Sequence, residues 1–495
     1  MANITTYANA RDRILFLQDS YKGGDSYKNP STALLGTALT TRSFIDKQGN
    51  VNTITDKAFK TYLVPHDGES KESFSARINC SSYLNICEPI VSAYVDACQS
   101  GIKRELGNLS EKLKEVTYSG DSYDEFIVEC AKEFAIAGFG FAVVVTDEQA
   151  QIKYHFVDPT KVAYLAVSDF GELQEFVFIN QSTIPNATKP NVQNVVMTRI
   201  TSAGFSIHAG ILDFDKEYSI DQLKQIGDTT PLPASLNGKL PVVSGYFQKD
   251  NGSLFPLGTS LIESQADIAR TVYNLQSYAY DILSMHFPQL IYPIKTDSGT
   301  LTPENERAMG SRVALTYSSE TNAPQYINPS AESSKELREH CDSLIKQAYE
   351  MAKMDKNSSS IPQSGIALRI KSRDFENAVK RFAKQMQKFE TKLLEISAIM
   401  AGVGLNYSVS YGNQFTMLDV SENLQNALVV LNLSKDIEIG QKAKLEAVKY
   451  LLQNALPLDQ EVMKEVIASL EQATNKPIQK QDQLVVDMNQ DIPQE

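Results

Sequence analysis

The chain has 495 residues, enough for roughly two to four domains. Its 42% hydrophobic and 22% charged residues are ordinary for a folded protein, and its net charge of −13 argues against tight, salt-driven binding to nucleic-acid phosphates. The five cysteines include no Cys-x-x-Cys pair, which argues against a zinc site or a disulfide framework. The longest apolar run, 135–145, is shorter than the about 20 residues of a membrane span, so we expect a soluble chain with no membrane partner.

The N-terminal third begins with a polar segment. Residues 1–60 show weak periodicity, which predicts an irregular N-terminal arm with one helix at 11–21 that orders against a neighbour. Residues 74–106 carry a broad apolar face and predict helix, broken near Glu88 because Pro89 follows. Asp121 or Ser122 as a cap predicts a helix over 123–137, which Gly138 ends.

Short runs of β-branched and aromatic residues separated by turn residues follow this helix. They predict strands at 141–146, 151–157, 161–166, 174–179, 192–201, 204–208 and 241–247. Together with the helices before them, these strands indicate that residues 61–256 form an α+β domain with a mostly antiparallel sheet.

Long helical patterns occupy the next part of the chain. Residues 257–287 predict a helix with an apolar stripe made by Leu261, Ile268, Val272, Leu275 and Ile282. Few of its other residues are charged, so we expect protein on most sides and assign the stripe to contacts between copies of the chain. Residues 288–330 contain β-like runs, and residues 331–354 predict a second long helix.

A polar loop then leads to a third helix. Residues 355–372 contain Lys356, Asn357, Ser358, Ser359 and Ser360, which suit a flexible connector or, in a ring, a loop that reaches the lumen. Residues 373–418 predict an amphipathic helix and a strand. The predicted helix carries a row of Lys380, Lys384 and Lys388, which suits a solvated face, contact with an acidic neighbour or contact with a phosphate backbone. Residues 419–473 predict three short helices, and 474–495 a disordered tail.

No motif in the chain indicates catalysis. The stretch Ala137-Gly138-Phe139-Gly140 leaves a helix and enters a strand, whereas a phosphate-binding loop leaves a strand and opens a helix. The sequence contains no GxxxxGK[ST] or GxSxG motif, and its five histidines show no metal-binding spacing. We therefore assign no catalytic residue, no metal ligand and no cofactor.

Several short stretches, in this order and spacing, resemble the portal proteins of tailed bacteriophages. They are Tyr62-Leu63-Val64-Pro65 followed by Phe74-Ser75-Ala76-Arg77, then Glu133 to Val145, Leu257 to Pro288, and Ser364-Gly365-Ile366-Ala367. The order of a helix, a β-containing insert, a second helix, a polar loop and a third helix is also similar. The resemblance covers roughly residues 60 to 470.

The resemblance implies a portal-like wedge with an α+β wing, a two-helix stem, a small β-containing clip and a helical C-terminal crown. The wing would be 1–256 with 373–418, the stem 257–287 and 331–354, the clip 288–330, and the crown 419–473. The implied role is a head–tail connector at one capsid vertex of a virion, assembled in the host cytoplasm. It would be a homododecamer that conducts double-stranded DNA during viral DNA packaging and DNA ejection without hydrolysing anything.

The implied partners are further copies of the chain, double-stranded DNA, the terminase large subunit, head–tail adaptor proteins and the major capsid protein. An acidic ring would repel DNA on average and so limit adhesion during transport. Two alternatives fit the residues without the resemblance. One is a cytosolic enzyme with an α+β domain and a helical domain. The other is a different head–tail adaptor or minor capsid protein.

Overall fold

The computed structural model describes residues 4–28, 41–45, 51–55, 61–65, 69, 71–147, 151–183, 185, 192–213, 220–250, 257–285, 291–294, 315–318, 331–354 and 365–412. The chain divides into two compact units, Met1–Phe415 and Thr416–Glu495, and every described residue belongs to the first. The predicted crown and tail, 419–495, lie outside the described residues. Among the described helices, none combines the length and apolarity that a membrane crossing requires.

The N-terminal segment is part of the folded unit. It forms α1 (Ile4–Lys22) and α2 (Asp25–Lys28), and Phe16, Leu17 and Tyr27 are buried in the main core of the same chain. The predicted helix at 11–21 is confirmed as part of α1. The prediction that this segment orders against a neighbour is wrong for residues 4–28, because these apolar side chains find partners within the chain. Two further strands, β1 (Thr41–Ile45) and β2 (Val51–Thr55), pair antiparallel.

The helical pattern over 74–106 resolves into two separate helices, α3 (Lys71–Cys80) and α4 (Cys87–Gln99). The break lies at 81–86, before the predicted position. Pro89 falls in the first turn of α4, where a missing backbone N–H costs no helical hydrogen bond. It is therefore compatible with the start of this helix and does not kink it. Strand β3 (Lys103–Glu105) and the short 3₁₀ helix η2 (Gly107–Lys112) follow.

Helix α5 (Tyr123–Ala137) has the predicted bounds. Ser122 accepts from the backbone N–H of Glu125, and the Glu125 carboxylate accepts from the backbone N–H of Ser122, so the two residues form a capping box. Gly138 ends the helix with a φ of 89°, and a Cβ placed there would come within 2.6 Å of the Gly258 carbonyl oxygen. Only glycine fits this turn.

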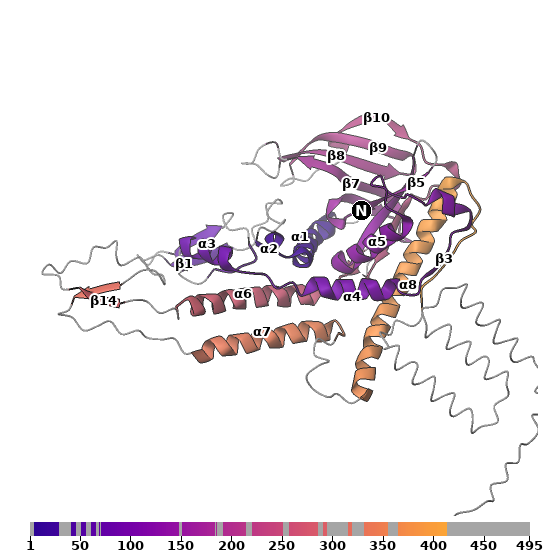
Figure 1. Ribbon diagram of the computed structural model, residues 1–495. Helices are drawn as coiled ribbons and strands as arrows, with labels where there is room; N and C mark the ends of the chain where they lie inside the picture. The colour runs from indigo at the N-terminus through magenta and orange to yellow at the C-terminus, as the bar shows by residue number, and fades with distance from the viewer. Residues whose placement is uncertain are drawn as a thin grey trace, which may run out of the picture. The chain divides into compact units, whose positions relative to one another are not determined.

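Two antiparallel sheets build the β part of the unit. The three-stranded sheet has the order β11-β4-β5, from Val242–Tyr246, Phe139–Thr146 and Ile152–Val157. The five-stranded sheet has the order β10-β9-β8-β7-β6, with its strands side by side in Figure 1. These strands are β6 (Val162–Val167), β7 (Leu173–Thr183), β8 (Val192–Thr201), β9 (Gly204–Asp213) and β10 (Lys224–Thr230).

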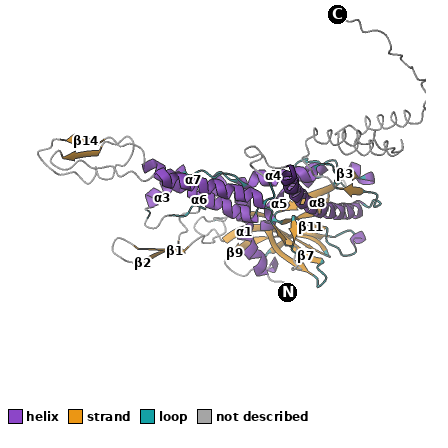
Figure 2. Cartoon of the chain, turned by 90° about the horizontal axis from the view of Figure 1, so that it is seen from below, coloured by secondary structure: helices purple, strands orange, loops and turns teal. Residues whose placement is uncertain are grey.

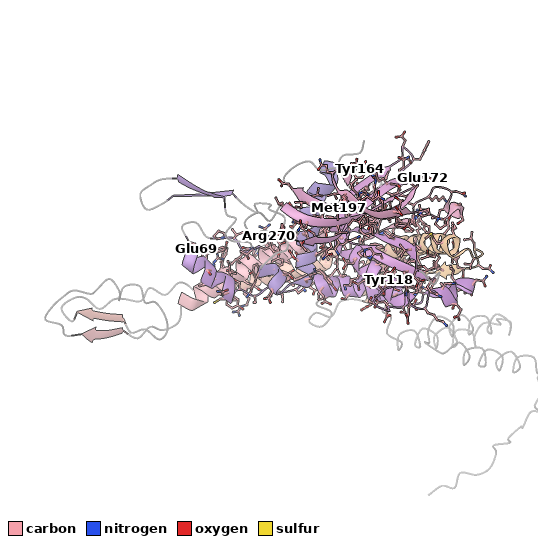
Figure 3. All side chains as sticks on the ribbon, turned by 90° about the horizontal axis from the view of Figure 1, so that it is seen from above. Glu69, Tyr118, Tyr164, Glu172, Met197 and Arg270 are labelled. Carbon is pink, nitrogen blue, oxygen red and sulfur yellow. The ribbon has the colours of Figure 1, made fainter. Side chains whose placement is uncertain are left out.

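The predicted antiparallel pairing is confirmed for the seven predicted strands in these two sheets, and the eighth strand, β10, was missed. All seven of its residues are exposed, so it shows no alternation of buried and exposed positions. Met197 and Tyr164, labelled in Figure 3, belong to a small cluster that packs on one face of this sheet. Short connectors complete the region: η3 (Pro159–Lys161), η4 (Ile220–Gln222), η5 (Ala234–Leu236), β12 (Gln248–Lys249) and β13 (Gly258–Thr259).

Three long helices complete the described unit: α6 (Glu263–Met285), α7 (Ala331–Met351) and α8 (Gly365–Ala401). Between the first two, β14 (Ile291–Ile294) pairs in parallel with β15 (Leu315–Ser318). Helix α8 begins earlier than the predicted residue 373, because the helix formers after Gly365 extend it without a breaker. Strand β16 (Ser408–Ser410) then pairs with β3.

Candidate functional site

An extended feature of the described unit is a pair of long helices, α6 and α7, which we call the helix pair. They lie side by side in Figures 1 and 2 and pack on each other along their length. At 1.5 Å per residue they are about 35 Å and about 32 Å long. Ala266 and Ala269 of α6 and Ala348 of α7 are fully or nearly fully buried in the main core.

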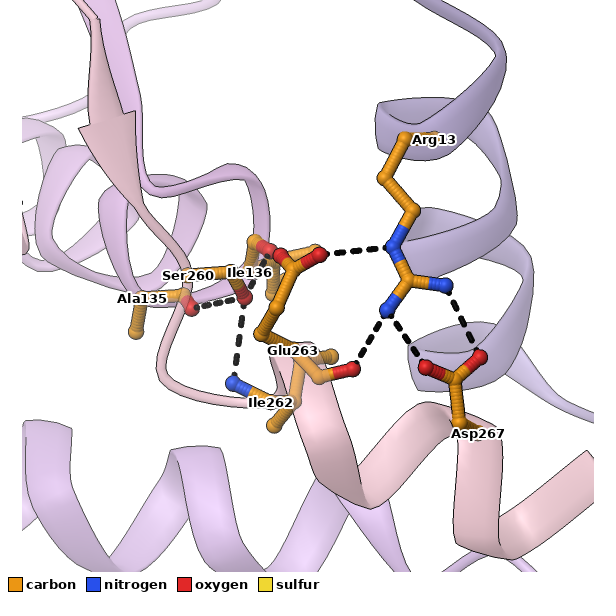
Figure 4. Close-up of polar contacts among 7 residues, drawn as sticks. All are labelled: Arg13, Ala135, Ile136, Ser260, Ile262, Glu263 and Asp267. Atoms are coloured by element: carbon orange, nitrogen blue, oxygen red, sulfur yellow. Dashed lines mark hydrogen bonds and ion pairs between the residues drawn. The ribbon is translucent and has the colours of Figure 1, made fainter. Parts of the chain in front are cut away.

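The start of α6 and the end of α7 are each attached to the domain by hydrogen bonds. At the start of α6, the Ser260 hydroxyl donates to the Ile136 carbonyl at 2.6 Å and accepts from the backbone N–H of Ile262 at 3.0 Å (Figure 4). At the end of α7, the Tyr94 hydroxyl donates to the Ala352 carbonyl at 2.8 Å. Both anchors are on neighbouring helices, α5 and α4. The two long helices are therefore antiparallel, with the strands β14 and β15 between them in sequence.

An arginine of the N-terminal helix clamps the first turns of α6. Arg13 donates from Nε to the Glu263 carboxylate at 2.7 Å, and from Nη1 and Nη2 to the two Asp267 oxygens at 2.9 Å each (Figure 4). A fourth guanidinium hydrogen bond, from Nη2, reaches the Glu263 carbonyl at 2.5 Å. Planar, bidentate pairing fixes geometry better than a single contact does, so Arg13 sets how α1 lies on α6.

The stretches 62–65 and 74–77 also converge on α6. The backbone N–H of Val64 donates to Asn274 Oδ1 at 2.7 Å, and Arg77 donates to the Ser277 hydroxyl at 2.8 Å. Arg77 also pairs with Glu69, labelled in Figure 3, at 2.7 Å, and both side chains are almost completely buried. A buried, multiply bonded arginine is costly to move, so these contacts hold α6 at a defined angle.

The predicted contact stripe of α6 is largely occupied within the chain. Val272 is 1% exposed and belongs to the main core, so it has no surface to offer a second copy, and its assignment to such a contact is wrong. Leu261, Ile268 and Leu275 are partly buried against the same core, and for them the contact remains a prediction. The side chain of Ile282 and the loop residues Lys356, Asn357, Ser358, Ser359 and Ser360 lie outside the described residues.

The exposed side of α8 carries a run of cations, which we call the basic stripe: Arg381, Lys384, Lys388 and Lys392. Each is exposed, and none forms an ion pair with another described residue. Lys380, part of the predicted row, is only half-buried and lies off this line. Arg381 and Lys392, which extend the exposed line at both ends, were not part of the predicted row.

The opposite side of α8 holds a fully buried carboxylate, Glu390. It pairs with Arg104 of β3 at 2.5 Å and accepts from the hydroxyls of Tyr123 at 3.1 Å and Tyr411 at 2.7 Å. Burial and the neighbouring carboxylate raise the pKa of both tyrosines well above the usual range, so both remain neutral donors. This network, which sequence patterns did not indicate, joins α8 to β3, α5 and the segment after β16.

The described residues hold no cluster of three or more His, Cys, Asp or Glu side chains that could bind a metal. At the Ala137–Gly140 turn, the Gly138 N–H already donates to the Phe134 carbonyl at 2.9 Å. It is therefore committed to the helix end and cannot cradle a phosphate. The polar groups described above attach long helices to the domain, which suits positioning and assembly.

No family model and no curated protein matches the chain. Among solved structures, it is similar to chains of the neck of a native GTA particle computed with C12 symmetry and of the virion of a native gene transfer agent (GTA) particle. The first shares 10% identity over 77% of this chain and 89% of that chain, with a TM-score of 0.36. The second shares 10% identity over 73% and 89%, with a TM-score of 0.39.

An HK97 family phage portal protein from Corynebacterium diphtheriae is also similar, with 10% identity, 66% of this chain and 92% of that chain covered, and a TM-score of 0.32. These TM-scores are too low to place the chain in a family. Its function has to follow from its own residues.

Proposed function

We propose that this chain is the subunit of a closed ring at one vertex of a phage virion, through which double-stranded DNA passes during packaging and ejection. The observation that carries the proposal is the antiparallel helix pair, which is anchored at both ends to one domain and has a β-containing insert, 288–330, between its helices. Rigid elongated elements repeated around an axis enclose a channel, because closed rotational symmetry brings the same surface to each neighbour.

In this proposal the chain hydrolyses nothing and needs no cofactor. About twelve copies form the ring, with 288–330 as the clip that docks the terminase large subunit and later the head–tail adaptor proteins. The wing contacts the major capsid protein, and the polar loop 356–360 touches DNA without gripping it. The net charge of −13 per copy supports passage, since an acidic channel wall repels DNA on average.

Electron microscopy of the purified full-length chain tests the ring. We expect closed particles with a central hole, and a strict monomer at high protein concentration over several salt concentrations would refute the proposal. Deletion of residues 357–360 tests the loop separately. We expect the deleted chain to assemble rings of normal size in infected cells while DNA packaging or retention falls, and full genome filling would exclude the role of the loop.

A further inference from the structure

The basic stripe of α8 needs an explanation, because four cations stand together on a chain whose net charge is strongly negative. Over the twelve residues from 381 to 392 the stripe extends about 16 Å along the helix. Its members have no anionic partner among the described residues. Like charges at three- and four-residue spacing repel one another, so the stripe destabilises the isolated subunit. An anionic partner would remove this repulsion.

A matching anionic surface lies on α5. Asp124, Glu125 and Glu129 are exposed on one side of this helix, and we call them the acidic face. Asp124 contacts Arg104, whose charge is shared with buried Glu390, and Glu129 lies 3.6 Å from Lys132. Glu125 and Glu129 are four residues apart, as are Lys384 and Lys388. Both spacings correspond to about 6 Å along a helix.

The basic stripe and the acidic face point away from each other. Residues two positions apart on a helix face nearly opposite sides, since each step turns about 100°. Lys384 and Lys388 precede buried Met386 and Glu390 by two positions, and Glu125 and Glu129 likewise precede buried Ile127 and Ala131.

The buried sides of α5 and α8 contact each other. The rings of Phe134 and Phe389 are 4.9 Å apart, and the Tyr123 hydroxyl donates to Glu390. Because the two helices meet through these sides, their charged sides lie on opposite sides of the domain.

We propose that the basic stripe of one copy docks on the acidic face of the next copy, an inference that rests on the ring function. Complementary surfaces on opposite sides of one subunit produce head-to-tail association, which closes into a ring when the rotation between copies closes. Two such helices bring opposite charges together at equal spacing, which fixes register and orientation more than it adds affinity. DNA is the other polyanion that could meet the stripe.

Charge exchange between the two surfaces tests this interface. One variant reverses the stripe with Lys384→Glu and Lys388→Glu. A second changes the acidic face with Glu125→Gln, Val128→Lys and Glu129→Lys, where Gln retains the hydrogen bonds of the capping box. A third carries all five substitutions and keeps the net charge of the natural chain. Lys114→Glu with Lys224→Glu, at exposed positions outside α5 and α8, is the charge control. Circular dichroism checks that each variant is folded.

The readout is the protein concentration at which half of the chain is in rings, measured by size-exclusion chromatography with light scattering and by electron microscopy. At about 0.1 M salt we expect each single-surface variant to raise this concentration at least tenfold. For the variant with all five substitutions, this concentration should lie within threefold of the value for the natural chain. For the charge control, it should equal the value for the natural chain. Raising the salt to about 0.5 M should weaken the natural ring, because exposed charges are screened over shorter distances.

The interface is excluded, and the ring function left intact, if both single-surface variants form rings at the same protein concentration as the natural chain. The same holds if the variant with all five substitutions assembles no better than the single-surface variants. If stripe-reversed rings form normally but lose DNA retention in virions, the stripe faces DNA and the interface is likewise excluded. Absence of rings from the natural chain refutes the ring function itself.

Discussion

Replacement of the buried carboxylate Glu390 by glutamine is the sharpest test of how α8 is held. Glutamine keeps the size of the side chain but removes the negative charge that faces Arg104, whose side chain is 15% exposed. Breaking a buried pair by removing one partner typically costs about 3–5 kcal/mol, since the other charge is left uncompensated. Here Asp124 remains 2.8 Å from Arg104 on the solvent side, so we expect the lower end, about 3 kcal/mol.

For a unit of this size, about 3 kcal/mol corresponds to a fall in Tm of roughly 3–6 °C. Thermal unfolding followed by near-ultraviolet circular dichroism on the full chain measures it, and hydrogen exchange should show faster exchange in β3 and β16. Tyr411→Phe removes one hydrogen bond to the same carboxylate and should cost about 1.5–3 kcal/mol. Tyr118→Phe, at a 79% exposed tyrosine, is the control. A Glu390→Gln variant that melts within 1 °C of the natural chain would refute this reasoning.

Three further changes test the other attachments. Gly138→Ala should either prevent soluble expression or lower the free energy of unfolding, measured with urea, by more than about 2 kcal/mol. The reason is that its φ is 89° and a Cβ would lie 2.6 Å from a backbone oxygen. A stable variant would contradict this turn geometry. Arg13→Met should speed proteolysis within α1 while leaving the sheets protected, and equal cleavage rates would exclude the clamp. Burial raises the pKa of Glu133 to about 7, so the folded state binds its proton more tightly than the unfolded state. The free energy of unfolding should therefore fall as pH rises from about 4.5 to 7. Glu133→Gln should stabilise the chain at pH 8 but not at pH 4.5. If the substitution shifts the urea midpoint equally at the two pH values, this titration is excluded.

Local signals explain why part of the fold could be predicted. The bounds of α5 followed from Ser122 and Gly138, because capping is decided by residues at the helix ends. Strands such as β4 and β8 were visible because one or both faces are buried. The exposed edge strand β10 shows no such contrast between its faces, and tertiary pairing with β9 alone makes it a strand.

Predictions that depended on tertiary partners were less successful. The apolar stripe of α6 correctly indicated burial, but periodicity cannot distinguish a partner in the same chain from one in another copy, and Val272 is buried within the chain. The buried pairs of Arg77 with Glu69 and Arg104 with Glu390 join residues whose relation appears only in three dimensions. Arg104 and Glu390, for example, are 286 positions apart.

The location of these ion pairs suggests what the unit has to do mechanically. Arg13 and Arg77 both attach α6, and Glu390 with Arg104 attaches α8, so these three arginine networks lie where a long helix meets the domain, whereas Arg199 with Glu175 and Asp221 lies within the β region. Buried charge pairs add little net stability compared with apolar packing, but they tolerate few alternative geometries. Helices that only filled a core would need no such fixation. Helices that must present the same surface at the same angle in every copy do, because a small angular error at the attachment grows along a helix of about 35 Å and would prevent a ring from closing.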